Sequence, residues 1–140
     1  MSLCKGPLFA PIASKIHSAC FDRGWTEKEF SRLLNLPTSR LWMSETALLL
    51  CSHVADEMEI LTICVLPEVR RQHQASDLLQ EMCSYAKEKN IKKIFLEVAE
   101  DNLAAQKLYA SFNFVQTGRR SGYYLRSSGN VDALCLTKNC

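Results

Sequence analysis

Two segments near the amino terminus have the apolar spacing of amphipathic helices. The first lies near residues 11–21, where Pro11 occupies a position that the first turn of a helix tolerates. The second runs from Glu27 to about residue 34. Its start is well defined, because Thr26 precedes Glu29 by three residues and the pair forms a capping box. We therefore expect two helices before the first long strand.

Short apolar runs separated by polar turns then replace the helical spacing. The runs cover residues 41–43, 47–54 and 58–65, and Pro67 closes the last of them. Runs of this length between polar turns are typical of strands. The pattern predicts an antiparallel meander of three strands.

In the second half of the chain, helical and strand patterns alternate. The expected elements are a helix over 75–90, a strand over 91–98, a helix capped by Asp101 or Asn102, and strands over 114–119 and 133–137. The order leaves room for a short strand before the first helix. We predict a mixed α/β (α+β) fold around one sheet, without internal repeats or linkers, so that residues 1–140 form one domain.

Composition narrows the function classes. With 47% hydrophobic and 23% charged residues, the chain has the composition of a globular domain. A net charge of +2 is too small to indicate nucleic acid as the main partner. The longest apolar runs, near residues 47–51 and 63–66, are far shorter than the roughly 20 residues of a membrane span. No signal peptide is recognisable at the amino terminus.

The seven cysteines point to a reducing compartment. Their number is odd and no C-x-x-C occurs, which argues against a disulfide framework and against zinc. We expect a cytoplasmic protein without a metal centre, in which most of the cysteines are small core residues.

A basic turn between a strand and a helix is the first candidate site. Arg70 and Arg71 follow Pro67, and an amphipathic helix begins directly afterwards. Unpaired amide groups and the positive end of the helix dipole meet at such a place and favour an anion. A solvated loop with two surface arginines explains the same residues equally well.

A second segment shows a family resemblance. It runs from Glu97 to Tyr109 with the sequence EVAEDNLAAQKLY and is followed by Phe112, Asn113 and Phe114. With these motifs, residues 57–136 resemble the GNAT superfamily of N-acetyltransferases, and within it the bacterial ribosomal-protein-alanine N-acetyltransferases. The segment around Trp25 also resembles the early helix of that family. The resemblance implies a GNAT-like, mostly antiparallel sheet flanked by helices.

The resemblance also implies the reaction and its residues. Acetyl-coenzyme A (acetyl-CoA) is the implied cosubstrate, Glu97 the general base, and Tyr109 the acid that protonates departing coenzyme A. Tyr123 and Tyr124 are expected near the acceptor. The implied cofactor contacts are Ile63, Cys64 and Val65 on the fourth strand of the family, Arg70, Arg71, Gln72, His73, Gln74, Ala75 and Ser76 in the pyrophosphate loop, and Asn102 and Tyr109.

Two positions depart from the family pattern. His73 replaces the first glycine of the phosphate loop, and Asn113 replaces a glycine between the two aromatic residues. Asparagine tolerates the left-handed conformation that helix ends often need, so its substitution is mild. The His73 side chain either obstructs the cofactor or, as an imidazolium, adds a charge to the site.

Alternatives remain for single residues and for the function. Taken alone, Glu97 is an ordinary residue on the exposed face of a strand, Tyr109 a core residue, and Asn102 a helix cap. The favoured acceptor is a protein N-terminus, and the resemblance implies the N-terminal alanine of a small-subunit ribosomal protein. The alternatives are acetylation of a small-molecule amine and a degenerate fold that only binds a cofactor or another protein.

Overall fold

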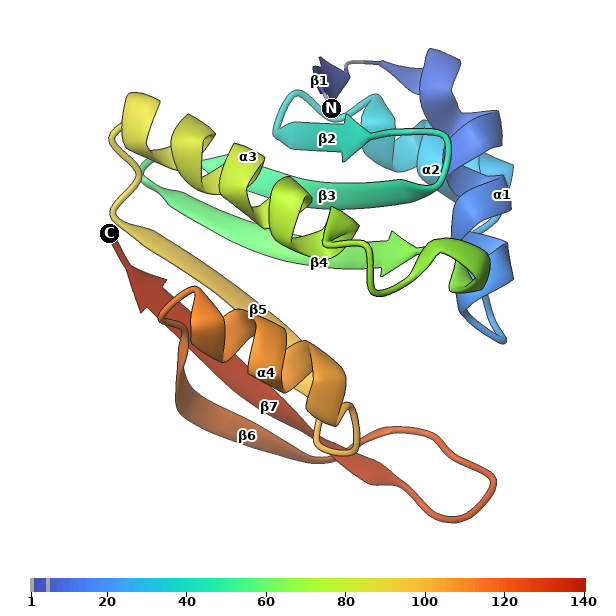
Figure 1. Cartoon of the computed structure of the whole chain (residues 1–140), viewed down its shortest axis with the longest axis vertical. Coiled ribbons are helices and arrows are strands. Elements are labelled where there is room, and N and C mark those ends of the chain that lie inside the picture. Colours follow the sequence, from blue (N-terminus) through green and yellow to red (C-terminus); the bar gives the residue numbers. More distant parts are fainter. Residues whose placement is uncertain (1, 5) are drawn as a thin grey trace.

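The computed structural model describes residues 2–4 and 6–140 (Figure 1). The strands are β1 (Ser2–Cys4), β2 (Ser39–Met43), β3 (Ala47–Val54), β4 (Glu57–Val65), β5 (Lys93–Ala99), β6 (Val115–Tyr124) and β7 (Val131–Asn139). The helices are α1 (Ala10–Cys20), α2 (Glu27–Leu34), α3 (Gln74–Glu88) and α4 (Leu103–Ser111), with single 3-10 turns at Pro7–Phe9 and Pro67–Val69. The predicted order of elements is confirmed, including the short strand at the start.

All strands belong to one mixed sheet with the order β1-β2-β3-β4-β5-β7-β6. The predicted meander is confirmed, because β2, β3 and β4 pair antiparallel in sequence order. The pair β4 and β5 is parallel, and α3 makes the crossover between them. Strands β5, β6 and β7 pair antiparallel and form the other half of the sheet.

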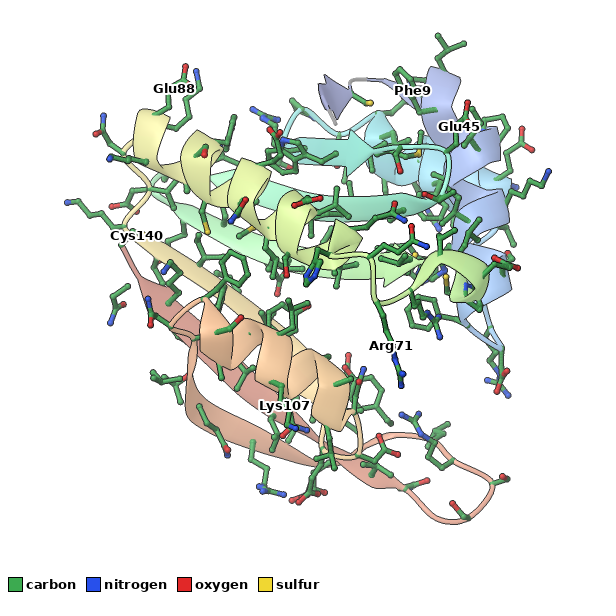
Figure 2. The ribbon with its side chains drawn as sticks, viewed as in Figure 1. Phe9, Glu45, Arg71, Glu88, Lys107 and Cys140 are labelled. Carbon is green, nitrogen blue, oxygen red and sulfur yellow. The ribbon has the colours of Figure 1, made fainter. Side chains whose placement is uncertain are left out.

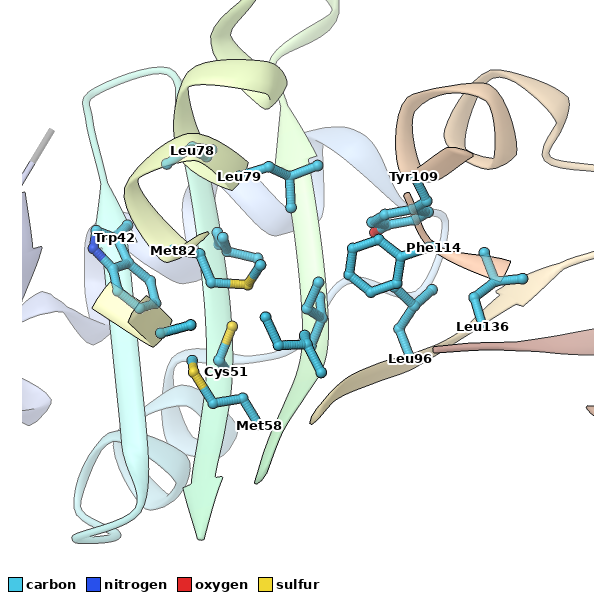
Figure 3. Packing of buried hydrophobic residues seen from close by; sticks show 14 of the residues in the cluster. Trp42, Cys51, Met58, Leu78, Leu79, Met82, Leu96, Tyr109, Phe114 and Leu136 are labelled. Carbon is cyan, nitrogen blue, oxygen red and sulfur yellow. The ribbon is translucent and has the colours of Figure 1, made fainter. Parts of the chain in front are cut away.

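Two hydrophobic cores cover the two faces of the sheet. On one face, α3 and α4 pack over the strands, and Figure 3 shows Leu78, Leu79 and Met82 of α3 on one side of this core and Tyr109 and Phe114 on the other. On the opposite face, α1 and α2 cover β2, β3 and β4 through a separate cluster of buried residues. Helices therefore cover both faces of the half formed by β2, β3 and β4, whereas α4 lies on one face of the half formed by β5, β6 and β7.

The predicted helix starts agree closely with the structure. Thr26 caps α2, since its Oγ1 accepts the backbone N–H of Glu29 at 3.1 Å. Of the two candidates for the α4 cap, Asn102 is the one used, because its Oδ1 accepts the N–H of Ala105 at 3.2 Å.

Strands β2 and β7 are longer than predicted, with β2 starting at Ser39 and β7 covering Val131–Asn139, and the boundaries of β5 and β6 also differ from the prediction. The strand expected over 91–98 begins at Lys93, because the N–H of Ile91 is held in the turn by the carbonyl of Ala86 at 2.9 Å. The strand expected to end at Arg119 continues to Tyr124. A register irregularity lengthens this strand, and the left-handed Gly122 lies within it with φ at 59°. Sequence periodicity does not show such irregularities.

Three further features bear on the function classes. In the chain as described, the longest helix has 15 residues, and no helix is long and apolar enough to cross a membrane. Within the same residues, no cluster of histidine, cysteine and acidic side chains is arranged to hold a metal ion. Cys20, Cys51, Cys64, Cys83, Cys135 and Cys140 are free thiols, and Cys51 and Cys64 are buried.

Candidate active site

The site lies where β4 and β5 separate. Their parallel pairing has only three steps and ends at Glu59 opposite Phe95, although β4 continues to Val65 and β5 to Ala99. Beyond this point, the backbone groups of β4 that face β5 have no strand partner. Figure 1 shows the two strands diverging, with α3 over one half of the sheet and α4 over the other. A polar ligand is the natural partner for such unpaired amides.

A bulge in β4 marks the start of the divergence. Opposite β3, Ile60 pairs with Cys51 and Thr62 pairs with Leu50, so Leu61 is an extra residue in β4. A bulge bends its strand and increases the local twist, which turns the end of β4 away from β5. No sequence signal indicated this bulge.

The three β4 residues expected at the cofactor offer their backbone rather than their side chains. The side chains of Ile63 and Val65 pack against the core under α3. Cys64 is buried in the opposite core, under α1 and α2, where burial raises the pKa of its thiol. A ligand bound where β4 and β5 separate would therefore contact the peptide groups of residues 63–65 and not their side chains.

The expected pyrophosphate loop leads directly into the N-terminus of α3. The first hydrogen bond of the helix runs from the N–H of Asp77 to the carbonyl of His73 at 2.9 Å. The N–H groups of Gln74, Ala75 and Ser76 precede it, in the turn where helical amides have no intrahelical partner. They lie beside the exposed Arg70 and Arg71, so donors and positive charge converge as an anion site requires.

His73 and Arg71 both have left-handed backbone conformations. Their φ angles are 62° and 66°, in a region that glycine adopts without strain and other residues rarely use. The family glycine at position 73 thus corresponds to a backbone requirement that His73 meets, and its side chain is exposed. Figure 2 shows the Arg71 side chain extending away from α3, toward the half of the sheet that carries α4.

Two side chains of the loop fix its position instead of facing outward. Arg70 donates through Nε to the carbonyl of Val65 at 2.9 Å, which ties the loop to the end of β4. Gln74 accepts a hydrogen bond from the hydroxyl of Thr46 at 2.6 Å, which ties it to the turn between β2 and β3. Gln72 is exposed. The Gln74 side chain therefore supports the loop, and its backbone N–H is the group that remains for an anion.

Glu97 lies on β5, on the face of the sheet opposite α3 and α4. Its neighbours Leu96 and Val98 point into the core under those helices, so alternation places Glu97 on the other face. Its side chain is 24% exposed, and its Oε1 forms an ion pair with Arg120, whose Nε lies 2.9 Å away. The expected base is thus a partly buried carboxylate with one cationic partner.

A second carboxylate shares this surface. Glu59 is the last β4 residue paired with β5, and like Glu97 it alternates with buried residues, Met58 and Ile60. Burial raises the pKa of Glu59, the charge of Glu97 raises it further, and Arg120 opposes both. Sequence reasoning missed Glu59 and Arg120. The alternation of Glu59 with buried neighbours was the available signal.

Tyr109 approaches the separation from the other face. Its ring is 3% exposed and packs edge-on against Phe114, with ring centroids 5.5 Å apart. Burial raises the pKa of its hydroxyl, and the nearby Cys51 and Tyr124 add to the rise. In Figure 3 the hydroxyl points from α4 toward the side of β4.

The Tyr109 hydroxyl is available to a ligand. The described part of the chain contains no buried side-chain oxygen or nitrogen that lacks a hydrogen-bond partner. Since no protein group there is hydrogen bonded to the Tyr109 hydroxyl, its oxygen is in contact with solvent. A free donor at the end of a buried ring is suited to a leaving group placed between β4 and β5.

The two tyrosines expected near the acceptor lie at the end of β6. The Tyr124 hydroxyl donates to the backbone carbonyl of Glu97 at 3.5 Å, and burial, followed by the charge of Glu97, raises its pKa. Tyr123 is 51% exposed and lies under the guanidinium of Arg120. Both tyrosines therefore belong to the same surface as Glu97, whereas the expected cofactor residue Asn102 uses its side-chain oxygen to cap α4.

Acetyl-CoA fits these groups from one face, and an amine fits from the other. The arginines and free amides at the start of α3 suit the pyrophosphate, and the unpaired amides of β4 suit the pantetheine and the thioester carbonyl. Two carboxylates suit a cationic amine. The two sets of groups lie on opposite faces of the sheet, and the gap where β4 and β5 separate is a place where an acetyl group could pass from one substrate to the other.

Curated relatives carry names for this chemistry. The chain is 28% identical over 131 residues to the [ribosomal protein bS18]-alanine N-acetyltransferase of Escherichia coli (strain K12), covering 90% of this chain and 88% of that protein. It is 30% identical over 128 residues to a putative [ribosomal protein bS18]-alanine N-acetyltransferase of Bacillus subtilis (strain 168), covering 87% and 83% of the two chains.

Solved structures share the fold over nearly the whole chain. The crystal structure of the ribosomal-protein-S18-alanine N-acetyltransferase from Escherichia coli superposes with a TM-score of 0.89 at 24% identity, covering 99% of this chain and 92% of that one. Arabidopsis thaliana NAA60 in complex with acetyl-CoA gives a TM-score of 0.83 at 18% identity, covering 99% and 98%.

The family match spans most of the described helices and strands. Residues 12–114 match the acetyltransferase (GNAT) family, a segment that extends from α1 to the end of α4 and includes β4, the loop before α3, Glu97 and Tyr109. The predicted fold class and enzyme class are confirmed. The chain belongs to the GNAT family and is an acetyl-CoA-dependent N-acetyltransferase.

Proposed function

We propose that this enzyme acetylates the N-terminal α-amine of a protein, and that its substrate is the N-terminal alanine of a small-subunit ribosomal protein. The structural support is the paired carboxylate surface of Glu97 and Glu59, which lies on the face of the sheet opposite the anion-binding loop. The names of the relatives support the choice of acceptor, since they act on the alanine of ribosomal protein bS18.

The α-amine suits a site with one general base. With a reference pKa of about 7.7 to 8.0, roughly a tenth to a fifth of the α-amine is unprotonated at pH 7, whereas less than about a thousandth of a lysine amine is free. Glu97 therefore acts on an amine of which a useful fraction is already unprotonated. The free fraction of a lysine amine is at least about a hundredfold smaller, which makes it the poorer acceptor at pH 7.

The transfer then follows from the positions of the groups. The amine nitrogen attacks the thioester carbonyl carbon, and Glu97, directly or through a water molecule, takes the proton that the nitrogen loses. Backbone N–H groups among residues 60–65 donate to the carbonyl oxygen as it becomes an oxyanion. The carbon–sulfur bond breaks, and coenzyme A leaves as a thiolate.

Tyr109 stabilises that thiolate mainly as a hydrogen-bond donor. Even at reference pKa values, moving its proton to a thiol near 8.5 is uphill by about 1.5 pH units, or roughly 2 kcal/mol. Burial raises the pKa of Tyr109 and makes full transfer costlier still. A hydrogen bond from its free hydroxyl to the sulfur lowers the energy of the departing charge without that cost.

The acceptor class can be tested with one peptide. The purified protein is incubated with acetyl-CoA and a hexapeptide that begins with alanine and contains an internal lysine, and tandem mass spectrometry locates the acetyl group. We expect one acetyl group, on the α-amine. The matched control is the same peptide with its amino terminus already acetylated, which should remain unmodified.

The outcomes separate the alternatives. Acetylation of the lysine would contradict the proposed α-amine specificity. Faster acetylation of spermidine than of the peptide would identify a small-molecule amine acetyltransferase instead. Failure to bind acetyl-CoA in calorimetry would point to a degenerate binding module.

A further inference from the structure

Arg120 forms an ion pair with Glu97, the carboxylate that the proposed reaction uses as its base. The Nε of Arg120 lies 2.9 Å from the Oε1 of Glu97 within this ion pair. As long as this ion pair persists, an incoming ammonium group competes with the guanidinium for the same oxygen. The acceptor can reach Glu97 fully only after Arg120 has moved.

Loss of this ion pair costs Arg120 less free energy than it costs Glu97. The Arg120 side chain is 58% exposed, whereas that of Glu97 is 24% exposed. An exposed guanidinium exchanges its partner for water at little cost. A largely buried carboxylate is destabilised more when it has no cationic partner. Glu97 therefore favours replacement of Arg120 by another cation.

The second carboxylate strengthens this preference. Glu59 lies on the same face of the sheet as Glu97, because it pairs with Phe95, two residues before Glu97 on β5. The charges of Glu97 and Arg120 both act on its pKa. Two carboxylates and one guanidinium sum to a single negative charge, and departure of Arg120 would leave two. The surface therefore attracts a cation with or without Arg120 on it.

Arg120 also has a second contact that it can keep. Its guanidinium carbon lies 5.2 Å from the centroid of the exposed Tyr123 ring, within the range of a cation–π interaction. The backbone between Arg120 and Tyr124 departs from regular pairing with β7. The side chain can thus leave Glu97 without losing all of its partners.

We propose that Arg120 is a displaceable counter-ion of Glu97, which the ammonium group of the acceptor replaces on binding and which returns once the neutral, acetylated product has formed. This proposal rests on the proposed function. It makes Arg120 a positioning residue that favours entry of a charged amine and release of an uncharged amide. Only noncovalent contacts of Arg120 change, and none of its covalent bonds is made or broken.

The chain offers a matched control in Arg126. This arginine pairs with Asp101 at 3.3 Å and lies over the ring of Tyr124 at 5.5 Å, so it combines the same two kinds of contact. Its carboxylate partner is not the expected base. Replacing Arg126 by glutamine removes the same charge from the same end of the sheet without freeing Glu97.

The test measures binding of an acceptor peptide to the complex of the enzyme with coenzyme A. Isothermal titration calorimetry compares the wild type with Arg120→Gln, Arg120→Lys and Arg126→Gln, using a hexapeptide that begins with alanine. We expect Arg120→Gln to bind about two- to fivefold more tightly, the range that corresponds to an exposed ion pair. Arg120→Lys and Arg126→Gln should stay close to the wild type.

The N-acetylated form of the peptide completes the design. Because it has no charge to place on Glu97, its affinity should be the same in the wild type and in Arg120→Gln. Unchanged or weaker binding of the free peptide to Arg120→Gln would overturn the proposal, since Arg120 would then be a bystander or a direct contact. Equal tightening for both peptides would also overturn it, because the effect would not depend on the amine.

Turnover of the wild type keeps the two proposals apart. If the wild type acetylates the peptide but the affinities do not differ, the counter-ion role fails and the proposed function stands. If the wild type neither binds nor acetylates the peptide, both fail. Should Arg120→Gln not fold, Arg120→Ala serves in its place, with thermal melts of both variants as the check.

Discussion

Acid should destabilise this protein through His17, a buried residue of α1. Its Nδ1 accepts the backbone N–H of Trp25 at 2.9 Å, so the ring proton lies on Nε2 and is donated to the Thr62 hydroxyl at 3.1 Å. The ring also stacks on Trp25, with centroids 4.6 Å apart. The hydrogen bond from Trp25 requires the neutral imidazole, because Nδ1 can accept it only without a proton. Because Thr62 lies on β4, the contacts of His17 connect α1 to the strand of the active site.

The size of the effect follows from the pKa of His17. Burial lowers it from 6.5 to about 4, and the charge of Glu29 opposes this only in part. Between these two values the unfolded chain binds a proton that the folded chain does not, so stability is complete above pH 6.5 and is lost as the pH falls toward 4. A difference of roughly 2.5 pH units corresponds to about 3 kcal/mol. Domains are typically stable by only about 5–15 kcal/mol, so the loss is large.

Urea denaturation followed by tryptophan fluorescence measures this loss. The free energy of unfolding is determined between pH 7.5 and 4.5 for the wild type and for His17→Gln. We expect the variant to be less stable at pH 7.5 but to lose about 2.5 kcal/mol less on acidification to pH 4.5, since its side chain does not titrate. Parallel declines in the two proteins would refute the argument, as would an NMR titration of the wild type that shows His17 protonated in the folded state at pH 6.

Three further predictions concern the active site. Glu97→Gln should lower turnover by a factor of about 10² to 10⁴, the usual effect of removing a general base. The affinity for acetyl-CoA should stay within about threefold of the wild type. Undiminished turnover with saturating peptide would exclude Glu97 as the general base. Tyr109→Phe keeps the buried ring, so the variant should still fold. Its loss of activity should shrink as the pH rises, because free thiolate then becomes an acceptable product. A loss of folded protein at every pH would show that Tyr109 has a structural role instead. His73→Gly keeps the left-handed backbone and removes one donor, so we expect calorimetry to show weaker acetyl-CoA binding. Tighter binding would show that the imidazole obstructs the site.

The sequence predicted the elements well because their signals are local. Thr26 and Asn102 cap their helices with side chains that reach only three residues along the chain, and apolar periodicity needs no more than one or two turns. The loop from Arg70 onward was also recognisable, since a strand, a basic turn and a helix follow one another directly. The left-handed backbone of His73 explains why a glycine is usual there.

The rest of the site depends on pairing between distant strands. The early end of the β4–β5 pairing and the extra residue Leu61 arise from how β4 fits β3 and β5, which no local pattern encodes. Glu59, Glu97 and Arg120 come from three strands, and the register of β6 is irregular on both sides of Arg120. The sequence alone therefore does not predict that these three side chains lie together. Alternation with buried neighbours does indicate the face of the sheet on which each glutamate lies.

Amide hydrogen exchange with and without acetyl-CoA tests the central claim most directly, namely that the cosubstrate binds where β4 leaves β5. Acetyl-CoA should slow exchange in two segments, residues 60–65 and residues 70–76, whose amides lack strand or helix partners facing the gap between β4 and β5. Exchange in α2 should stay the same. Protection confined to other segments, or none at all at saturating acetyl-CoA, would show that the cosubstrate does not bind at this gap.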